Sequence, residues 1–275
     1  EESFKVLAAA GGKIVRLTFA AEAVEDTGFS LSFGGDESVR KFAVASREEL
    51  DYQGSTPNSI IIGQDGNWGY VFHDKNRVSV YNLRNEPVLT QDLALTEGHV
   101  EVTTVAALQG NISLLVGDST GQVSQWFMVR DAKSEVDVFS LQKIRTVKLG
   151  ESPITALAAE PRRKGFVAGD SRGVMSYYYT TSERLIAQEQ ASTTPIRALS
   201  VSARSHGILV QSEDSYSFWH LEIEHPDISM SSSWSKVWYE SYQAPTYTWQ
   251  SSSGTPDFES KLSLMPLTFG TLKAA

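Results

Sequence analysis

An aspartate in a short turn recurs along this chain about every 40 to 50 residues. The five positions are Asp36, Asp74, Asp118, Asp170 and Asp214. Each aspartate follows one apolar run and precedes another, as in ISLLVGD before GQVSQWFMV and KGFVAGD before GVMSYYY. Short apolar runs on both sides of a turn are typical of β-hairpins. The recurrence therefore predicts five hairpins in series, with the aspartates as structural turn residues.

Two further strand-like segments accompany most of these hairpins. A short apolar segment precedes each hairpin, and these segments are KIVRLTF from Lys13, SIII from Ser59, VTTVAAL from Val102, ITALAAE from Ile154 and IRALSV from Ile196. A β-rich segment follows three of them, namely VLTQDLAL, FSLQKIRTVKL and RLIAQEQAS. Four strands in each repeat indicate a propeller blade. We therefore expect an all-β propeller of four-stranded antiparallel blades, with about five blades in this chain.

Two other fold classes fit this pattern less well. A sandwich or a simple barrel would not require an aspartate turn to return in register. A parallel α/β sheet would need helical segments between the strands, and no stretch of 10 to 15 residues carries a 3.6-residue apolar period there.

The ends of the repeat array allow two arrangements. The stretch SFKVLAAA from Ser3 precedes the first predicted strand, and the last unit has three clear strands that end near Ile223. The N-terminal stretch could complete the last blade, which would remove unpaired strand edges. Alternatively, the native ring is larger and its opening blades precede this sequence, which begins at Glu1. The sequence agrees with both arrangements.

Several residues give the units a resemblance to WD-repeat blades. Gly98-His99 matches the Gly-His turn of that family, the five aspartates match its turn aspartate, and Trp126, Tyr178 and Trp219 lie near its usual tryptophan position. A Trp-Asp dipeptide, which usually closes a blade in that family, is missing from the sequence. The resemblance implies a fold rather than an activity.

Composition excludes several classes of function. The chain has 24 basic and 33 acidic residues, a formal charge of −9, which opposes attraction to nucleic acid. Cysteine is absent, so disulfides, thiolate nucleophiles and cysteine zinc sites are excluded. The five histidines do not show the spacing of zinc ligands. We therefore predict no nucleic-acid partner, no metal and no cofactor.

Two sequences match the G-x-S-x-G motif of serine hydrolases, at residues 117–121 and 169–173. That motif exposes its serine on a turn from a strand into a helix. Here each match joins two predicted strands at equivalent positions of two blades, so turn chemistry explains both. Calcium loops need several ligands in one segment, whereas the turn aspartates are spread one per blade. We predict that the protein is not an enzyme.

Three consecutive positive charges, Arg162, Arg163 and Lys164, lie between the first two strands of the fourth unit. They are candidate contacts for an anionic partner, and the alternative is a solvated loop. The run Tyr177-Tyr178-Tyr179 is predicted to pack between blades, with alternate rings on opposite faces of the sheet.

The periodic pattern ends at Ile223, which predicts propeller blades over residues 1–225 and a connector over residues 226–275. The connector is rich in serine, proline and aromatic residues. It either packs across the propeller as a strap or leads to a membrane segment outside this sequence, because its last stretch, LSLMPLTFGTLKAA, is apolar. The chain itself contains no run of 18 apolar residues, so it holds no membrane span of its own.

The stretch from Trp238 to Ala275 resembles the permease subunits of phosphate (Pst-type) ABC transporters, especially in YESY, YTWQ and LMPLTFGTLKAA. The propeller is similar to a large insertion found in some bacterial members of that family. This resemblance implies a place on the periplasmic side of the bacterial inner membrane, within an integral membrane protein. Pro266 would then break a helix, and Gly270 and Thr271 would permit close backbone approach in a segment that nears the membrane.

Three hypotheses follow. The first is a non-catalytic periplasmic propeller domain of a phosphate-type permease, a protein-interaction or regulatory module whose partners are other transporter subunits or an envelope or substrate-binding protein. The second is a soluble WD-repeat-like protein-interaction scaffold. The third is a propeller enzyme, which would require convergent carboxylates or a metal on the axis.

Overall fold

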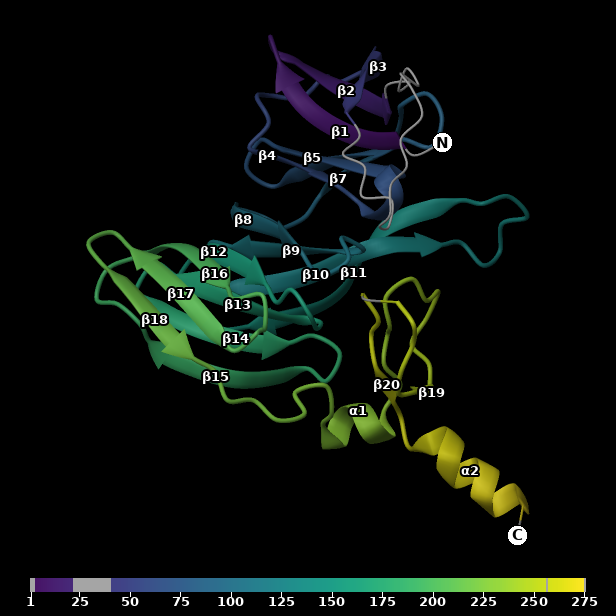
Figure 1. The fold of residues 1–275 in the computed structure, drawn as a ribbon, viewed down its shortest axis with the longest axis vertical. Helices are drawn as coiled ribbons and strands as arrows, with labels where there is room; N and C mark the ends of the chain where they lie inside the picture. The colour runs from purple at the N-terminus through teal and green to yellow at the C-terminus, as the bar shows by residue number, and fades with distance from the viewer. Residues whose placement is uncertain (1–2, 22–40, 256, 275) are drawn as a thin grey trace, which may run out of the picture. The chain divides into compact units, whose positions relative to one another are not determined.

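The computed structural model describes residues 3–21, 41–255 and 257–274 (Figure 1). Contacts divide the chain into two compact units. Unit 1 contains Glu1–Asp74 and Ser79–Asp92, and unit 2 contains Lys75–Val78 and Leu93–Ala275. Within each sheet of three or four strands, the strands follow the order of the sequence and pair antiparallel.

The first two sheets contain seven strands. A three-stranded sheet consists of β1 (Ser3–Ala10), β2 (Lys13–Ala21) and β3 (Phe42–Glu49). A four-stranded sheet consists of β4 (Ser59–Ile62), β5 (Trp68–His73), β6 (Arg77–Asn82) and β7 (Val88–Ala94), with a 3-10 helix at Gln64–Gly66. The apolar core of unit 1 combines side chains from both sheets, among them Ile14, Val71 and Tyr81.

Unit 2 contains three further blades. The third sheet consists of β8 (Val102–Ala107), β9 (Ser113–Asp118), β10 (Gln122–Arg130) and β11 (Phe139–Lys148). The fourth consists of β12 (Ile154–Ala159), β13 (Gly165–Asp170), β14 (Val174–Tyr179) and β15 (Arg184–Gln190). The fifth has three strands, β16 (Ile196–Val201), β17 (Gly207–Ser212) and β18 (Tyr216–His220). Five successive antiparallel sheets confirm the predicted all-β class of propeller blades.

The prediction for the first blade was wrong in its strand order. Ser3–Ala10 was expected to belong to another blade, but β1 pairs with β2 in the same sheet. Gly11 and Gly12 join the two strands with φ values of 60° and 77°, which a two-residue hairpin turn requires and glycine permits. The N-terminal stretch is therefore not the missing strand of the fifth sheet. Asp36 lies in the chain between β2 and β3, outside the described residues.

The blades of unit 2 pack through side chains that alternate along each strand. β12 lies against both β8 and β16. Phe166 and Tyr178 contribute to the core shared with the third sheet, whereas Val167 and Tyr177 contribute to the core shared with the fifth. This alternation follows from the two-residue period of a strand. Each buried side chain of this size contributes about 1.5 to 3 kcal/mol to folding.

A repeated contact joins neighbouring blades beside these cores. The Thr103 hydroxyl donates to the Gly117 carbonyl at 3.1 Å and to that of Ile154 in the next blade. The Thr155 hydroxyl likewise donates to the Gly169 carbonyl at 3.2 Å and to the Ile196 carbonyl of the following blade at 2.6 Å. Gly169 leaves room for the incoming isoleucine, since a Cβ atom there would lie 2.5 Å from the Ile196 Cγ2 atom. Adjacent blades are thus fixed by both hydrogen bonds and close packing.

The C-terminal segment belongs to unit 2 rather than to a separate compact unit. It contains α1 (Met230–Trp234), β19 (Trp249–Gln250), β20 (Lys261–Leu262) and α2 (Met265–Ala274), and β19 pairs with β20. We call residues 226–264 the strap. The predicted boundary after residue 225, between the blades and a connector that leads to a membrane segment, stays a prediction.

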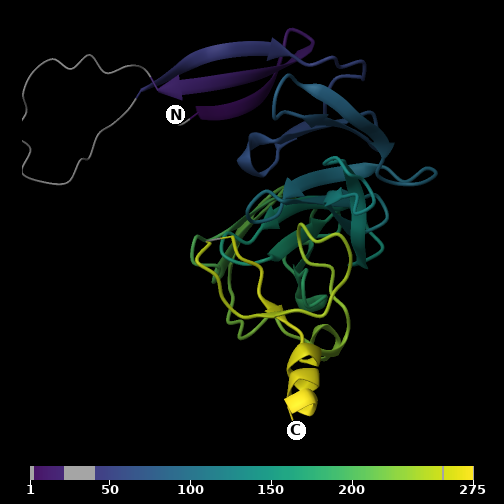
Figure 2. The ribbon, with the colours of Figure 1, turned by 90° about the vertical axis from the view of Figure 1, so that its right-hand side faces the viewer.

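The helix α2 follows the strap and projects away from the sheets of unit 2 (Figures 1 and 2). Pro266 is the second residue of α2, so it lies in the first turn and does not interrupt this helix. Its place in a membrane-approach segment stays a prediction. Proline is tolerated in a first turn, where its missing N–H has no intrahelical acceptor. Leu267, Phe269 and Leu272 on α2 are exposed. Among the described residues, no helix has both the length and the apolar character needed to cross a membrane.

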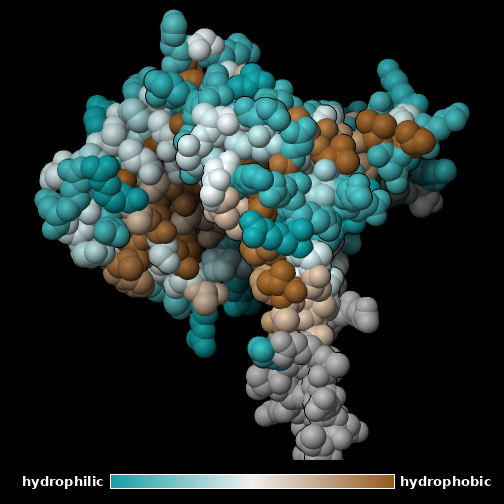
Figure 3. Space-filling view, turned by 90° about the horizontal axis from the view of Figure 1, so that it is seen from above, coloured by the Kyte–Doolittle hydropathy of each residue, from teal (hydrophilic) through white to brown (hydrophobic). Residues whose placement is uncertain are grey.

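The strands β10 and β11 form a hairpin that extends beyond the rest of the third sheet (Figure 1). The projecting arm on the right of Figure 3 carries apolar side chains between hydrophilic ones. Val136 and Val138, in and beside the loop of this hairpin, are both exposed.

Candidate binding cleft beside the strap

The turns after β9 and β13 share one hydrogen-bond pattern. Asp118 Oδ1 accepts the backbone N–H groups of Thr120 and Gln122 at 2.7 and 3.1 Å. Asp170 Oδ1 accepts those of Arg172 and Val174 at 2.9 and 2.8 Å. Both G-x-S-x-G matches lie in these strand-to-strand turns, where the carboxylate organises the backbone.

The aspartates of the other two described turns have different partners. Asp74 has a positive φ of 50°, and one carboxylate oxygen lies 3.0 Å from His73 Nδ1. Asp214 Oδ1 accepts the hydroxyl groups of Thr194 and Ser212 at 2.9 and 3.0 Å. These two hydroxyls hold the pKa of Asp214 below its usual value. Each of these four aspartates thus has a hydrogen-bonding role at its own turn or at the neighbouring loop between strands.

Buried charged groups attach the strap to the blades. Lys164 Nζ lies 2.6 Å from Glu240 Oε2, and the Ser113 hydroxyl donates to Glu240 Oε1 at 2.5 Å. A second strap carboxylate, Glu259, accepts the Thr181 hydroxyl at 2.6 Å and the backbone N–H of Glu240 at 2.8 Å. These partners come from the third and fourth sheets, so the strap joins two blades.

Of the three candidate contacts for an anionic partner, Lys164 is neither accessible to a partner nor solvated. Only 1% of Lys164 is exposed, because its side chain runs inward to Glu240 and donates to the Gln109 carbonyl at 2.7 Å. A lysine is almost never buried to this extent unless its charge is paired. The sequence shows the positive charge, whereas its buried partner comes from the distant strap.

Glu240 should make the stability of unit 2 depend on pH. Burial and the nearby Glu259 carboxylate raise the pKa of Glu240 to about 7, although Lys164 opposes this shift. The folded protein therefore holds a proton that the unfolded chain releases near pH 4.3. The contribution of this group to stability is then fully present below about pH 4.3 and is lost as the pH rises towards 7.

We expect the wild-type unfolding free energy to fall by about 1 to 3 kcal/mol more between pH 5 and pH 8 than that of Glu240→Gln. Urea unfolding at several pH values measures this difference. The exposed Glu135 lies in the loop after β10, and Glu135→Gln should follow the wild-type profile. Parallel pH profiles for the wild type and Glu240→Gln would contradict the assignment.

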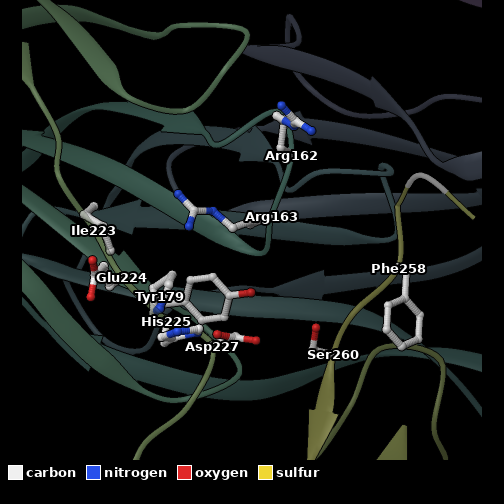
Figure 4. A pocket seen from close by; sticks show the side chains of 10 residues that line it. Arg162, Arg163, Tyr179, Ile223, Glu224, His225, Asp227, Phe258 and Ser260 are labelled. Carbon is white, nitrogen blue, oxygen red and sulfur yellow. The ribbon is translucent and has the colours of Figure 1, made fainter. Parts of the chain in front are cut away.

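A cleft of about 540 Å³ lies beside this buried cluster (Figure 4). Its walls come from the loop between β12 and β13, the end of β14, the chain after β18 and the strap. The lining residues are Arg162, Arg163, Tyr179, Ile223, Glu224, His225, Pro226, Asp227, Phe258 and Ser260. In Figure 4, the two arginines lie on one side and Tyr179, His225, Asp227 and Ser260 on the other.

The two arginines of the cleft differ in their charge environment. Arg163 Nε donates to Glu160 Oε1 at 2.5 Å, and Glu160 is buried and also accepts the Tyr177 hydroxyl. The charge of Arg163 is therefore compensated inside the protein. Arg162 is exposed and makes no ion pair with the described part of the chain. Arg162 is thus the cation of the cleft that is available to an external anion.

The remaining polar groups of the cleft come from Tyr179, Ser260, His225 and Asp227. Burial raises the pKa of Tyr179, so its hydroxyl remains protonated and serves as a hydrogen-bond donor. Ser260, His225 and Asp227 line the same cleft, but no hydrogen bond joins them in the residues that the structure describes. Phe258 adds an aromatic surface.

The other predicted site residues lie elsewhere. Pro266, Gly270 and Thr271 are on α2, outside the cleft. Arg162 and Arg163 were predicted as candidate contacts from the sequence. Tyr179, Asp227 and Phe258 were not, because only the folded chain brings them together.

The sequence matches no protein-family model and no curated protein. The structure is similar to the crystal structure of the computationally designed Ika4 protein, with a TM-score of 0.50 and 16% sequence identity, covering 63% of this chain and 96% of that chain. The fold is that of WD-repeat-like propeller blades. A chain of the mitotic checkpoint complex has a TM-score of 0.46 and 17% identity, covering 66% of this chain and 57% of that chain. Neither likeness links the blades to phosphate transporters.

Proposed function

We propose that this chain is a non-catalytic, WD-repeat-like scaffold that binds a polypeptide segment in the cleft beside the strap, with an acidic side chain of that segment on Arg162. Arg162 carries this proposal, because it is exposed at the cleft while the neighbouring Arg163 is neutralised by Glu160. Phe258 and the protonated Tyr179 hydroxyl add apolar contact and a hydrogen-bond donor. Such a mixture of a few polar groups and an aromatic surface suits recognition.

Reversing the charge of Arg162 should abolish this recognition. Random peptides displayed on phage and selected on the wild-type chain should be enriched in Asp and Glu. Their binding to Arg162→Glu should be at least about tenfold weaker, because a hydrogen bond to a charged group contributes about 1.5 to 3 kcal/mol.

Arg204 provides a matched control, since it is exposed in the equivalent loop between β16 and β17. Arg204→Glu should bind the selected peptides as the wild type does. Equal affinity of the peptides for Arg162→Glu, or a failure to enrich any acidic peptide, would refute the cleft as the binding site.

A second candidate function is a periplasmic domain of a phosphate-type ABC permease, working with other transporter subunits or a substrate-binding protein. The resemblance of residues 238–275 to such permeases supports it. So does the exposure of Leu267, Phe269 and Leu272 on α2, which would suit an apolar environment. The coding sequence after Ala275 tests it, because this function requires several apolar spans there. Continuation into a hydrophilic segment alone would refute it.

A further inference from the structure

The fifth sheet repeats the fourth strand for strand, but it ends one strand earlier. β18 occupies the place of β14, so that Phe218 pairs with Leu209 as Tyr177 pairs with Val167. β14 then pairs with a fourth strand, β15, along its other edge. No strand among the described residues pairs with the corresponding edge of β18 (Figure 1).

The backbone of β18 leaves a regular row of groups on that edge. Backbone hydrogen bonds join Leu221 to His206 and Ser212 to Ser215 at the two ends of the β17–β18 pair. Bonded and non-bonded pairs alternate in an antiparallel ladder. The N–H and C=O groups of Ser217 and Trp219 therefore point to β17, whereas those of Tyr216, Phe218 and His220 point to the free edge.

The side chains beside this edge are apolar and exposed. Phe218 is 66% exposed and Leu209 43%, whereas the equivalent Tyr177 and Val167 are 1% and 0% exposed against the fifth sheet. Tyr216 is 69% exposed, and its equivalent, Met175, is 3% exposed. Natural edge strands are usually protected by lysine, proline or a bulge. The sequence of β18, YSFWH, contains neither lysine nor proline, and its pairing with β17 is without a register shift.

We propose that β18 accepts a fourth strand from a separate polypeptide segment, an extended chain with apolar side chains at alternate positions. Its backbone would pair with Tyr216, Phe218 and His220, and its side chains would lie beside Phe218 on the exposed face. The pairing of β14 with β15 in the fourth sheet is the template for this interface. This surface is distinct from the cleft that contains Arg162.

A synthetic peptide with the sequence of residues 183–192, ERLIAQEQAS, is a suitable probe because it contains β15. Amide hydrogen exchange is followed by NMR on the full chain with increasing peptide. We expect the exchange of the Tyr216, Phe218 and His220 amides to slow at least about tenfold, while Ser217 and Trp219 change little, since they are already bonded to β17. No slowing at those three amides with millimolar peptide would overturn the proposal.

Two variants distinguish backbone pairing at the edge of β18 from non-specific hydrophobic binding. Phe218→Pro removes the central donor of the edge, and proline is tolerated on an edge strand. Peptide binding to this variant should fall at least about tenfold. In the protein, Leu185→Ser removes from β15 a leucine that is about as exposed as Leu209, and this variant should leave peptide binding unchanged. If Phe218→Pro unfolds, Phe218→Ala retains the backbone donor and should still show slowed exchange at residues 216 and 220. Equal binding by folded Phe218→Pro would overturn the proposal.

Discussion

Gly173→Ala is expected to destabilise unit 2 by about 2 to 5 kcal/mol. Gly173 ends the turn after Asp170 with a φ of 84°, and its carbonyl accepts the N–H groups of Ala191 and Ser192. A Cβ atom there would lie 2.1 Å from the Ser192 carbonyl oxygen. The left-handed backbone and the clash with another backbone atom both oppose the substitution, and neither is relieved by a rotamer change. Urea unfolding measures the loss.

Gly150→Ala is the matched control, because the nearest atom to its added Cβ would be Asp170 Oδ2 at 3.8 Å. This variant should change the unfolding free energy by less than about 1 kcal/mol. Similar stability of Gly173→Ala and Gly150→Ala would show that the linker after β15 is not fixed as described.

Lys164→Met should lower the unfolding free energy of unit 2 by a comparable amount. It leaves the buried Glu240 carboxylate without its counter-ion, and the removal of one member of a buried ion pair typically costs about 3 to 5 kcal/mol. The loss should be largest at pH 8 and smaller at pH 5, because a protonated Glu240 no longer requires a cation. Chemical denaturation of Lys164→Met at the two pH values measures both effects.

Lys148→Met is the comparison variant, since Lys148 pairs with Glu151 at the surface and should contribute less than about 1 kcal/mol. Adding Glu240→Gln to Lys164→Met should recover part of the lost stability, because the uncompensated charge is removed. A pH-independent loss without any such recovery would mean that Lys164 acts through packing alone.

The repeating blades could be predicted from the sequence because their information is local. From β4 to β18, the second and third strands of each blade meet at a turn with an aspartate such as Asp118, so the repeat period and the turn chemistry agree. The strand order of the first blade was not predicted, because the pattern around Asp36 indicated a different hairpin from the one that Gly11-Gly12 forms. The alternation that buries Tyr177 and Tyr178 on opposite faces of the fourth sheet was also predicted from the sequence.

The cleft was only partly predictable because its walls are far apart in sequence. The charge cluster predicted Arg162 and Arg163, but the sequence alone could not distinguish the buried Lys164 from the exposed Arg162. Its partner, Glu240, is an isolated acid between Tyr239 and Tyr242, and an acid within an aromatic run is a signal of burial that could have been used. Tyr179 and Asp227 carried no such signal.

The strap imposes an order on the assembly of unit 2. Glu240 needs Ser113 from the third sheet and Lys164 from the fourth, so neither sheet alone can hold it. During translation both sheets leave the ribosome before the strap does. The strap can therefore dock only after both sheets have left the ribosome, and until it does, Lys164 can keep its charge in water. A nascent chain that stalls before residue 240 would expose the third and fourth sheets, not yet joined by the strap, to chaperones and proteases.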